Sequence, residues 1–325
     1  MTAAPRARVQ RHPVHGVLLL DKPLGLSSNQ ALQKVKWLLR AEKAGHTGTL
    51  DPLATGVLPL CFGAATKFSG LHLDADKTYQ ATLRLGVTTT TGDAEGEVIA
   101  ERAVPSIAPG QLEQVRQRFL GRITQVPPMH SALKKDGKAL YEYARQGVEV
   151  ERAPREVEIH ELRLTLAPES PARAAIQMTV TCSKGTYIRT LGEDIGAALG
   201  CGGHLTALRR TATGPFDIHQ CLDLDALEGM DETARLRCLL PPESLVPGHE
   251  RVVLAAEEAG RFLSGLRRRG PWPDRPQVAV FGDQPRLFLG TAHVKAGELI
   301  PDRLMSPTEL MQMSASPATG VPPID

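Results

Sequence analysis

The chain has 325 residues, of which 42% are hydrophobic and 23% charged, with 38 Lys and Arg against 36 Asp and Glu. This length predicts about two domains, and the composition excludes a wholly disordered chain and, without a long apolar run, a membrane-spanning helix. The five cysteines form no C-x-x-C pair and the ten histidines no H-E-x-x-H motif, so we expect neither a disulfide framework nor a zinc site.

The N-terminal stretch is basic, with Arg6, Arg8 and Arg11 and no acidic residue among the first fifteen. We expect residues 1–12 to be disordered. The apolar run Gly16–Leu20 is too short for the core of a signal peptide. We therefore expect a cytoplasmic protein with reduced thiols.

The segment that follows gives strand and helix signals in turn. His15–Leu20 is typical of a short buried strand, and Ser27 or Ser28 can cap a helix that runs to about residue 40. Tyr79–Leu85 alternates apolar with polar residues, which predicts a half-buried strand. Gln111–Leu120 predicts an amphipathic helix that ends before a glycine.

The middle of the chain adds two helices and three strands. The predicted helices are Lys138–Gln146 and Thr186–Leu199, and the predicted strands are Val157–Leu166, Ala174–Cys182 and Leu205–Ala212. Several strands follow one another without an intervening helix. This order predicts an α+β fold with a mixed, largely antiparallel sheet flanked by helices, rather than a doubly wound parallel sheet.

The last third predicts a small second module. Residues 241–250 contain three prolines and are expected to be a linker. A strand at 252–256 and a helix at 257–267 follow, and then the short strands Val278–Phe281, Arg286–Ala292 and His293–Leu299. The tail, residues 306–325, is expected to be disordered.

The loop Gly45–Gly56 is the most informative stretch of the chain. It holds a single carboxylate, Asp51, among three glycines and directly before Pro52. Glycine permits left-handed backbone and proline stiffens it, so Asp51 is expected on a sharply bent, rigid loop of the kind that carries catalytic groups. An ordinary turn, in which the aspartate binds neighbouring amides, explains the same pattern equally well.

Basic residues cluster at three places that can contact phosphates. Residues 122–155 hold seven Lys or Arg against four Asp or Glu, and Arg209–Arg210 and Arg267–Arg269 form compact basic spots. Each cluster alone is more simply explained as a solvated charged face.

The Asp51 loop resembles the active-site loop of the TruB family of bacterial tRNA pseudouridine-55 synthases. Further segments resemble the same family in the same order, so that the likeness spans residues 14–216: they are Leu20–Gly25, Asp76–Tyr79, Gln125–Lys134, Cys182–Thr190 and Leu208–Arg210. The resemblance implies a pseudouridine synthase fold at 13–240, an RNA-clamping insertion at about 125–155 and a β-rich, PUA-like RNA-binding domain at 250–305.

The implied reaction breaks the C1′–N1 bond of uridine and joins C1′ to C5, without cofactor or metal. Breaking this bond builds positive charge on the ribose. A carboxylate can stabilise that charge, attack the ribose, or remove a neighbouring proton. The resemblance identifies Asp51 as the carboxylate and leaves these three roles open. It places Arg189 beside Asp51, where a guanidinium keeps the acid ionised. Lys22 adds positive charge near the same pocket or lies in solvent. Tyr79 is expected to stack on the flipped base and to help move the C5 proton.

The resemblance also implies contacts to the T-stem loop of tRNA. His46 is expected to insert into the RNA, Leu208 to close the apolar side of the pocket and Tyr187 to contact the substrate. Two departures from the family, His130 and Thr49, touch no proposed catalytic group. We expect a monomer that binds no membrane.

Two other functions remain to be weighed. A non-catalytic tRNA-binding or RNA-folding protein fits the basic clusters but gives Asp51, Arg189 and Tyr79 no role. A glycosidase-like hydrolase needs paired carboxylates, whereas Asp51 is alone in its loop and neither Asp21 nor Asp74 has an evident partner.

Overall fold

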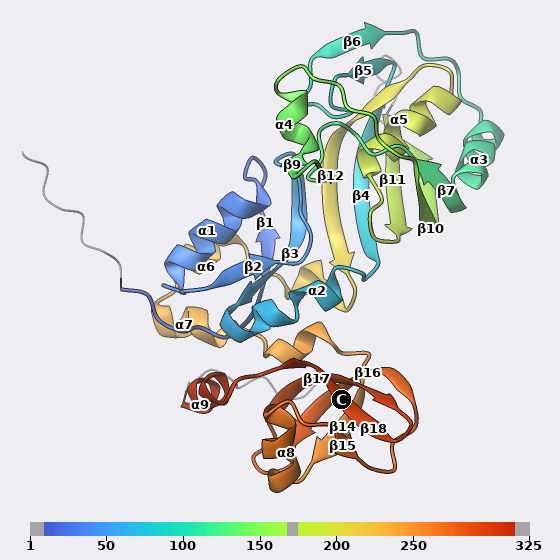
Figure 1. The fold of residues 1–325 in the computed structure, drawn as a ribbon. Coiled ribbons are helices and arrows are strands. Elements are labelled where there is room, and N and C mark those ends of the chain that lie inside the picture. Colours follow the sequence, from blue (N-terminus) through green and yellow to red (C-terminus); the bar gives the residue numbers. More distant parts are fainter. Residues whose placement is uncertain (1–9, 168–174, 316–325) are drawn as a thin grey trace, which may run out of the picture.

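The computed structural model describes residues 10–167 and 175–315, which form two main β-sheets with helices packed around them (Figure 1). The larger sheet has the strand order β1-β3-β12-β4-β11-β10-β7, and β12 runs parallel to β3 while the other neighbours along this path are antiparallel. In that order the strands are Gly16–Lys22, Ala54–Phe62, Gly203–Thr213, Lys77–Leu85, Ala175–Cys182, Arg155–Leu166 and Gly121–Gln125. The predicted α+β class and the mixed, largely antiparallel sheet are confirmed.

Strands β1 and β3 are covered on both faces. In β1, Leu18 and Leu20 lie in the core beneath the helices, while Val17 and Leu19 lie in the core on the opposite face. Two-sided burial explains why β1 reads as a continuous apolar run rather than as an alternation. Strand β4 is buried on one face and alternates as its sequence predicts, with Tyr79 among its buried residues.

Helices cover one face of this sheet, and their apolar residues share one core with it. Helix α1 begins with a capping box between Ser27 and Gln30, in agreement with the predicted start. The helices that contribute to this core are α1 (Ser28–Leu38), α3 (Pro109–Arg118), α5 (Ile188–Ala198) and α6 (Leu224–Gly229). Helix α5 brings its first turn, with Arg189, to the end of the sheet near the Asp51 loop.

The C-terminal β-rich domain packs below the other face of β1 and β3 (Figure 1). Its sheet has the order β14-β16-β17-β18-β15, which are Glu250–Leu254, Arg275–Gly282, Phe288–Lys295, Glu298–Leu304 and Arg268–Arg269, and helix α8 (Ala256–Leu263) covers it. The turn between β17 and β18 lies at Ala296–Gly297, where both residues have positive φ, and not between 292 and 293 as predicted.

Smaller elements complete the described chain. They are β2 (Ala44–His46), η1 (Gly63–Lys67), α2 (Ser69–His72), β5 (Val87–Thr89), β6 (Val98–Glu101), β8 (Lys134–Lys135), β9 (Lys138–Ala139), α4 (Leu140–Ala144), β13 (Phe216–Asp217), η2 (Ile218–Gln220), α7 (Glu232–Arg237) and η3 (Pro242–Leu245). None of the helices within residues 10–167 and 175–315 has the length and apolarity needed to cross a bilayer.

Both ends of the described chain are more ordered than predicted. Disorder was expected at residues 1–12, of which 1–9 lie outside the described residues. The expectation is wrong for His12, whose amide donates to Arg40 O at 2.9 Å. The tail prediction is wrong for 307–315, which form helix α9 (Pro307–Ala315), and falls outside the described residues for 316–325. Ser306 and Glu309 cap this helix through reciprocal hydrogen bonds of 3.2 and 2.7 Å.

The proline-rich stretch at 241–250 is packed rather than loose. It contains the short helix η3, and Leu245 and Val246 are buried in the core shared by the two sheets. The segment therefore fixes the C-terminal domain against the larger sheet instead of acting as a flexible linker.

Candidate active site

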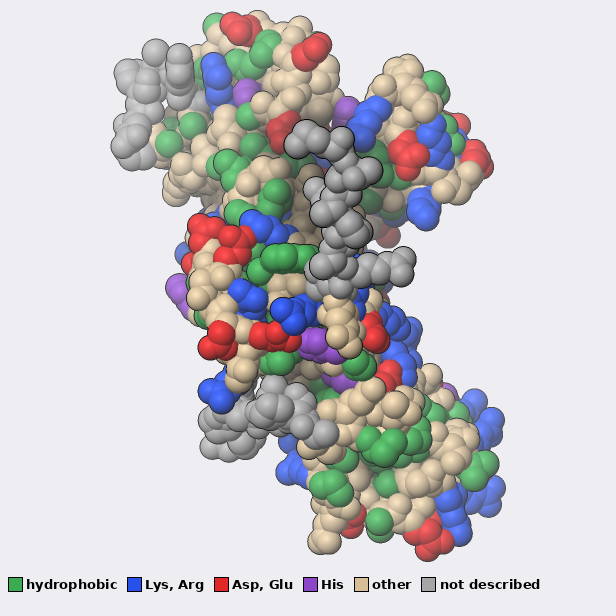
Figure 2. All heavy atoms as spheres, turned by 90° about the vertical axis from the view of Figure 1, so that its left-hand side faces the viewer, with side chains coloured by type: hydrophobic (Ala, Val, Ile, Leu, Met, Phe, Trp, Pro, Cys, Tyr) green, Lys and Arg blue, Asp and Glu red, His purple; other side chains and the backbone are tan. Residues whose placement is uncertain are grey.

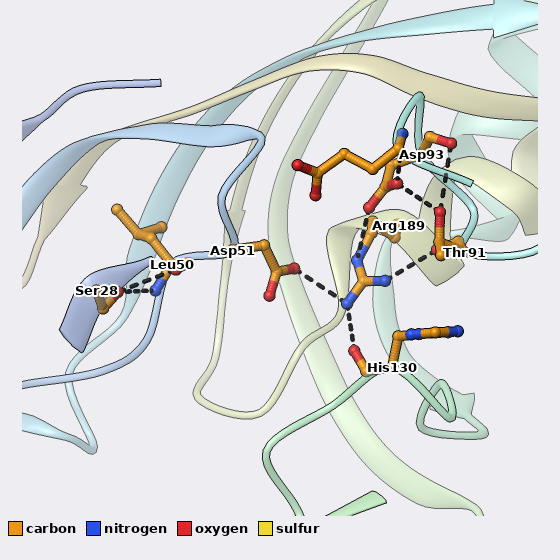
Figure 3. A network of polar contacts seen from close by, with 8 residues as sticks. Ser28, Leu50, Asp51, Thr91, Asp93, His130 and Arg189 are labelled. Atoms are coloured by element: carbon orange, nitrogen blue, oxygen red, sulfur yellow. Dashed lines mark hydrogen bonds and ion pairs between the residues drawn. The ribbon is translucent and has the colours of Figure 1, made fainter. Parts of the chain in front are cut away.

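Hydrogen bonds on both sides of Asp51 fix its loop. Leu50 N donates to Ser28 Oγ at 2.7 Å, and the same hydroxyl donates to Leu50 O at 3.0 Å (Figure 3). On the other side, Pro52 O accepts from Gly25 N at 2.9 Å. The start of α1 and the turn after β1 thus hold the loop rigidly, as the glycine and proline pattern predicts.

Asp51 and Arg189 form the ion pair that was expected. Arg189 Nη2 lies 3.0 Å from Asp51 Oδ2; the arginine side chain is 6% exposed and the aspartate side chain 40%. Arg189 also donates to Thr91 O at 2.9 Å and to His130 O at 2.6 Å (Figure 3). A guanidinium held at several points orients the Asp51 carboxylate, which still faces solvent.

A second carboxylate, Asp93, contacts the Nε atom of Arg189 and was not predicted from the sequence. Its Oδ2 lies 3.6 Å from Arg189 Nε, and its side chain is only 3% exposed. Its Oδ1 accepts hydrogen bonds from Thr91 Oγ1 at 2.5 Å and from Glu95 N at 3.0 Å. Asp93 is therefore a buried anchor for Arg189 within a tight turn.

The idea that Asp51 is the only carboxylate of its neighbourhood is wrong. Asp93 and Glu95 are both close to it. Burial and the neighbouring carboxylates Asp93 and Asp51 raise the pKa of Glu95. Asp21 and Asp74 contact cations instead of a second carboxylate, since Arg209 Nη2 lies 2.6 Å from Asp21 Oδ2 and Lys184 Nζ lies 2.7 Å from Asp74 Oδ1.

Lys22 is buried beneath the loop and does not extend into solvent. Its side chain is fully buried, and its Nζ donates to Pro23 O at 2.9 Å and to Leu26 O at 2.5 Å. Burial lowers the pKa of Lys22 to about 8, while Asp51 favours the charged form and Arg210 opposes it. Lys22 thus contributes a buried positive charge that interacts electrostatically with Asp51.

Lys22, Arg210 and Tyr79 lie in one row across the sheet. Lys22 pairs with Gly56, Gly56 with Arg210, and Arg210 with Tyr79. A Cβ on Gly56, whose φ is +104°, would lie 2.1 Å from Arg210 O, so only glycine fits this position. Leu208 is two residues before Arg210 on the same strand and is buried on the same face.

Arg210 is not the surface charge that the sequence suggested. It is 1% exposed, and its Nε donates to Val57 O at 2.7 Å. The cluster Arg267–Arg269 is also neutralised, because these arginines pair with Glu258 and Glu298. A cross-strand neighbour buries Arg210, and a sequence without a known register gives no signal of that burial.

The two remaining predicted residues are His46 and Tyr187. His46 ends β2; burial and Arg210 lower the pKa of its imidazole, and its Nδ1 has no hydrogen-bond partner among the residues that the structure describes. Tyr187 is the N-cap of α5, and its backbone is held by Gln125 through hydrogen bonds of 3.0 and 3.2 Å. Burial raises the pKa of the Tyr187 phenol.

The insertion at 125–155 contacts the site directly through His130 and presents basic side chains to solvent. Lys134, Lys135 and Arg145 are exposed on it. The face that carries α1, α6 and α7 has instead interspersed acidic and basic side chains (Figure 2), and Lys34 and Glu228 form one ion pair there. The insertion is therefore better suited to contact a polyanion than that face.

Comparison with protein families gives matches along most of the chain. Residues 36–188 match the model of the TruB family pseudouridylate synthase N-terminal domain. Residues 189–247 match the tRNA pseudouridylate synthase B C-terminal domain, and residues 251–305 match the model named pseudouridine synthase II TruB, C-terminal.

Curated relatives and solved structures resemble the chain over nearly its whole length. Proteins named tRNA pseudouridine synthase B are 64% identical in Verminephrobacter eiseniae and 53% identical in Burkholderia pseudomallei; the alignments cover 97% and 94% of this chain and 96% and 98% of those proteins. A chain in the crystal structure of a Cbf5-Nop10-Gar1 complex matches at a TM-score of 0.66 and 25% identity, covering 91% of this chain and 87% of that one. A chain of an H/ACA RNP bound to a substrate RNA shares the fold at the same TM-score and 22% identity, covering 91% of this chain and 86% of that one.

Proposed function

The chain belongs to the TruB family of pseudouridylate synthases, and we propose that it is the tRNA pseudouridine synthase that converts uridine-55 of the T loop to pseudouridine. The observation that supports this most directly is the ion pair between Arg189 and Asp51, in which the cation is buried and the carboxylate is half exposed. A carboxylate that is fixed in position and accessible suits a reaction that builds positive charge on a ribose.

Asp51 supplies the negative charge that cleavage of the C1′–N1 bond requires. Arg189 holds this carboxylate in place, and the buried Lys22 adds a positive potential near the loop. The uracil then turns, and its C5 bonds to C1′. Tyr79 is placed to stack on the extruded base and to receive the C5 proton afterwards.

The exposed basic insertion and His46 account for selection of the T-stem loop. A base that is flipped out leaves a gap in the RNA stack. His46, whose Nδ1 accepts or donates no hydrogen bond within the described part of the chain, is suited to fill that gap. Lys134, Lys135 and Arg145 supply phosphate contacts. Tyr187 and Leu208 complete the wall around the base. We further propose that the protein acts as a cytoplasmic monomer.

The test is incubation of unmodified tRNA with the protein, followed by mapping of pseudouridine. The wild type should form it at position 55, whereas Asp51→Asn should bind the tRNA without forming it. Asp74→Asn, which removes a carboxylate from an exposed ion pair, is the matched control and should be active. If Asp51→Asn still modifies the tRNA, Asp51 is not the essential carboxylate, and if the wild type binds without product, a non-catalytic RNA-binding protein is the better reading.

A further inference from the structure

Arg210 is a buried guanidinium without a carboxylate partner within 4 Å among the described residues. It donates to two backbone carbonyls, Val57 O at 2.7 Å and Gly48 O at 3.4 Å. Removing a charge from water without a counter-charge is unfavourable, so an arginine that only tied two carbonyls together would be a poor solution. Its position next to the catalytic loop suggests a use for the unpaired charge.

The register of the sheet places Tyr79 next to this charge. Arg210 and Tyr79 are directly paired residues of β12 and β4, so their side chains leave the sheet on the same face with Cβ atoms roughly 5 Å apart. Both are buried on the face that Leu208 shares. Gly48, whose carbonyl accepts a hydrogen bond from Arg210, is three residues before Asp51 in the sequence. One guanidinium thus touches the loop of the catalytic acid and borders the tyrosine.

Tyr79 needs a cation if it accepts a proton. Burial raises the pKa of Tyr79, so its phenolate is disfavoured, and Arg210 opposes this effect. The other groups that act on the phenol are Cys182 from β11 and Asp51 from the loop, and both disfavour the phenolate. Arg210 is therefore the neighbour that makes negative charge on the Tyr79 oxygen attainable.

We propose that Arg210 is a positioning residue for the C5-proton step: its guanidinium orients the Tyr79 hydroxyl and balances the negative charge on that oxygen, without touching the substrate. This inference rests on the proposed function. After C1′ has bonded to C5, the C5–H bond breaks and its electron pair forms the C5=C6 bond. The C6=N1 electron pair moves to N1, which takes up a proton from a water molecule. That water takes the phenolic proton of Tyr79 in turn, and the Tyr79 oxygen, which carries negative charge at this point, receives the C5 proton. The base is isomerised with no net change in its protons.

The experiment compares Arg210→Met and Arg210→Lys with wild type in single-turnover reactions. The substrate is tRNA transcribed with either ordinary or [5-²H]uridine. Arg210→Met should be about 100-fold slower, the size of a general-base contribution, and should show a primary deuterium isotope effect because C5–H cleavage has become rate-limiting. Arg210→Lys, which keeps the charge, should recover part of the rate. The tRNA Kd should not change.

Two controls separate this role from a merely structural one. Arg235→Met removes another arginine that donates to backbone carbonyls, Leu227 O and Leu38 O, far from the site, and should leave both the rate and the isotope effect unchanged. In a Tyr79→Phe background, followed over hours, Arg210→Met should change the rate by no more than about twofold, because the residue acts through Tyr79.

The inference is overturned if Arg210→Met slows the reaction equally with both tRNAs and additively with Tyr79→Phe, since Arg210 would then serve only to hold the fold. If Arg210→Met does not fold, the same comparison with Arg210→Lys decides. Asp51→Asn run in parallel distinguishes the two levels of the argument. A wild-type protein that forms pseudouridine and an inactive Asp51→Asn leave the proposed function intact whatever Arg210 does.

Discussion

Replacement of Asp93 by Asn should disable the site without touching the substrate surface. Asn Oδ1 can still accept from Thr91 Oγ1 and Glu95 N, the two bonds that shape the turn. The change therefore removes the charge that faces Arg189 Nε and puts an amide there. Among residues 10–167 and 175–315, Asp51 is then the one carboxylate left within 4 Å of Arg189.

The size of the effect follows from the distance and the burial. Unit charges 3.6 Å apart attract by about 5 kcal/mol at an effective dielectric constant of about 20. Breaking a buried pair by removal of one partner destabilises proteins by roughly 3–5 kcal/mol. Because Arg189 keeps Asp51 and two carbonyls, we expect the lower end, about 3 kcal/mol, in the free energy of unfolding.

The rate should fall more than the stability alone implies. If the guanidinium moves by about 1 Å, Asp51 moves with it, and a misplacement of that size slows catalysis by about 100-fold. The assay is single-turnover pseudouridine formation, with urea unfolding and the tRNA Kd measured on the same preparations. The Kd should stay constant, since Asp93 is buried.

The exposed pair of Asp74 and Lys184 provides the control. Asp74→Asn breaks an ion pair of 2.7 Å whose side chains are both exposed, and it should change the unfolding free energy by no more than about 1 kcal/mol, with an unchanged rate. An Asp93→Asn protein as fast and as stable as wild type would show that Arg189 is aligned by Asp51 and the carbonyls alone.

Three further predictions concern the pH dependence of stability, the last helix and the RNA contacts. The pKa of Lys22 is about 8 in the folded protein against an ordinary value of 10.5, so the unfolded chain binds more protons between these pH values. The free energy of unfolding should therefore rise with pH in that interval, by up to about 3 kcal/mol. Lys22→Met should lack this rise in urea unfolding between pH 8 and 10.5, and a pH profile identical to that of the wild type would contradict the burial of a charged amine. Glu309→Gln removes the charge that pairs with Lys67 but keeps an oxygen that can accept from Ser306 N, so helix α9 keeps its cap. The free energy of unfolding should fall by about 1 kcal/mol in thermal or urea melts, whereas no change would mean that the helix docks without help from this ion pair. The double variant Lys134→Ala, Lys135→Ala should reduce the slope of log Kd for tRNA against log salt concentration by about 1 per lysine. The rate at saturating tRNA should not change. An unaltered slope would show that these lysines of the insertion do not contact the RNA.

Local pattern was sufficient to predict many of the helices and strands, but not the central ion pair. The alternation in Tyr79–Leu85 gave the half-buried strand, and the serine at 27 gave the start of α1, because each depends on neighbours within a few residues. The contact between Asp51 and Arg189 was expected only through resemblance, since 138 positions separate the two residues. The catalytic roles of the site residues remain predictions.

The residues that sequence reasoning missed depend on register or on an overlooked cap. Arg210 is buried because Gly56 and Tyr79 flank it in the sheet, and a strand sequence does not reveal its neighbours. Asp93 meets Arg189 by tertiary packing alone. Helix α9, however, had a signal: a serine three residues before a glutamate, with a proline at the first helical position, is a common helix start.

The positions of the cations explain why an arginine is tolerated at the first turn of α5. A cation at a helix N-terminus is disfavoured by roughly 0.3–1 kcal/mol, and Arg189 is also almost completely buried. Two carboxylates at different nitrogens of its guanidinium offset this penalty. They differ in exposure, since Asp93 is buried and Asp51 is open to solvent. Because Asp93 already holds Arg189, Asp51 can exchange its solvent for substrate without leaving the cation alone. The buried pair therefore serves the fold, and the exposed carboxylate is left available for chemistry.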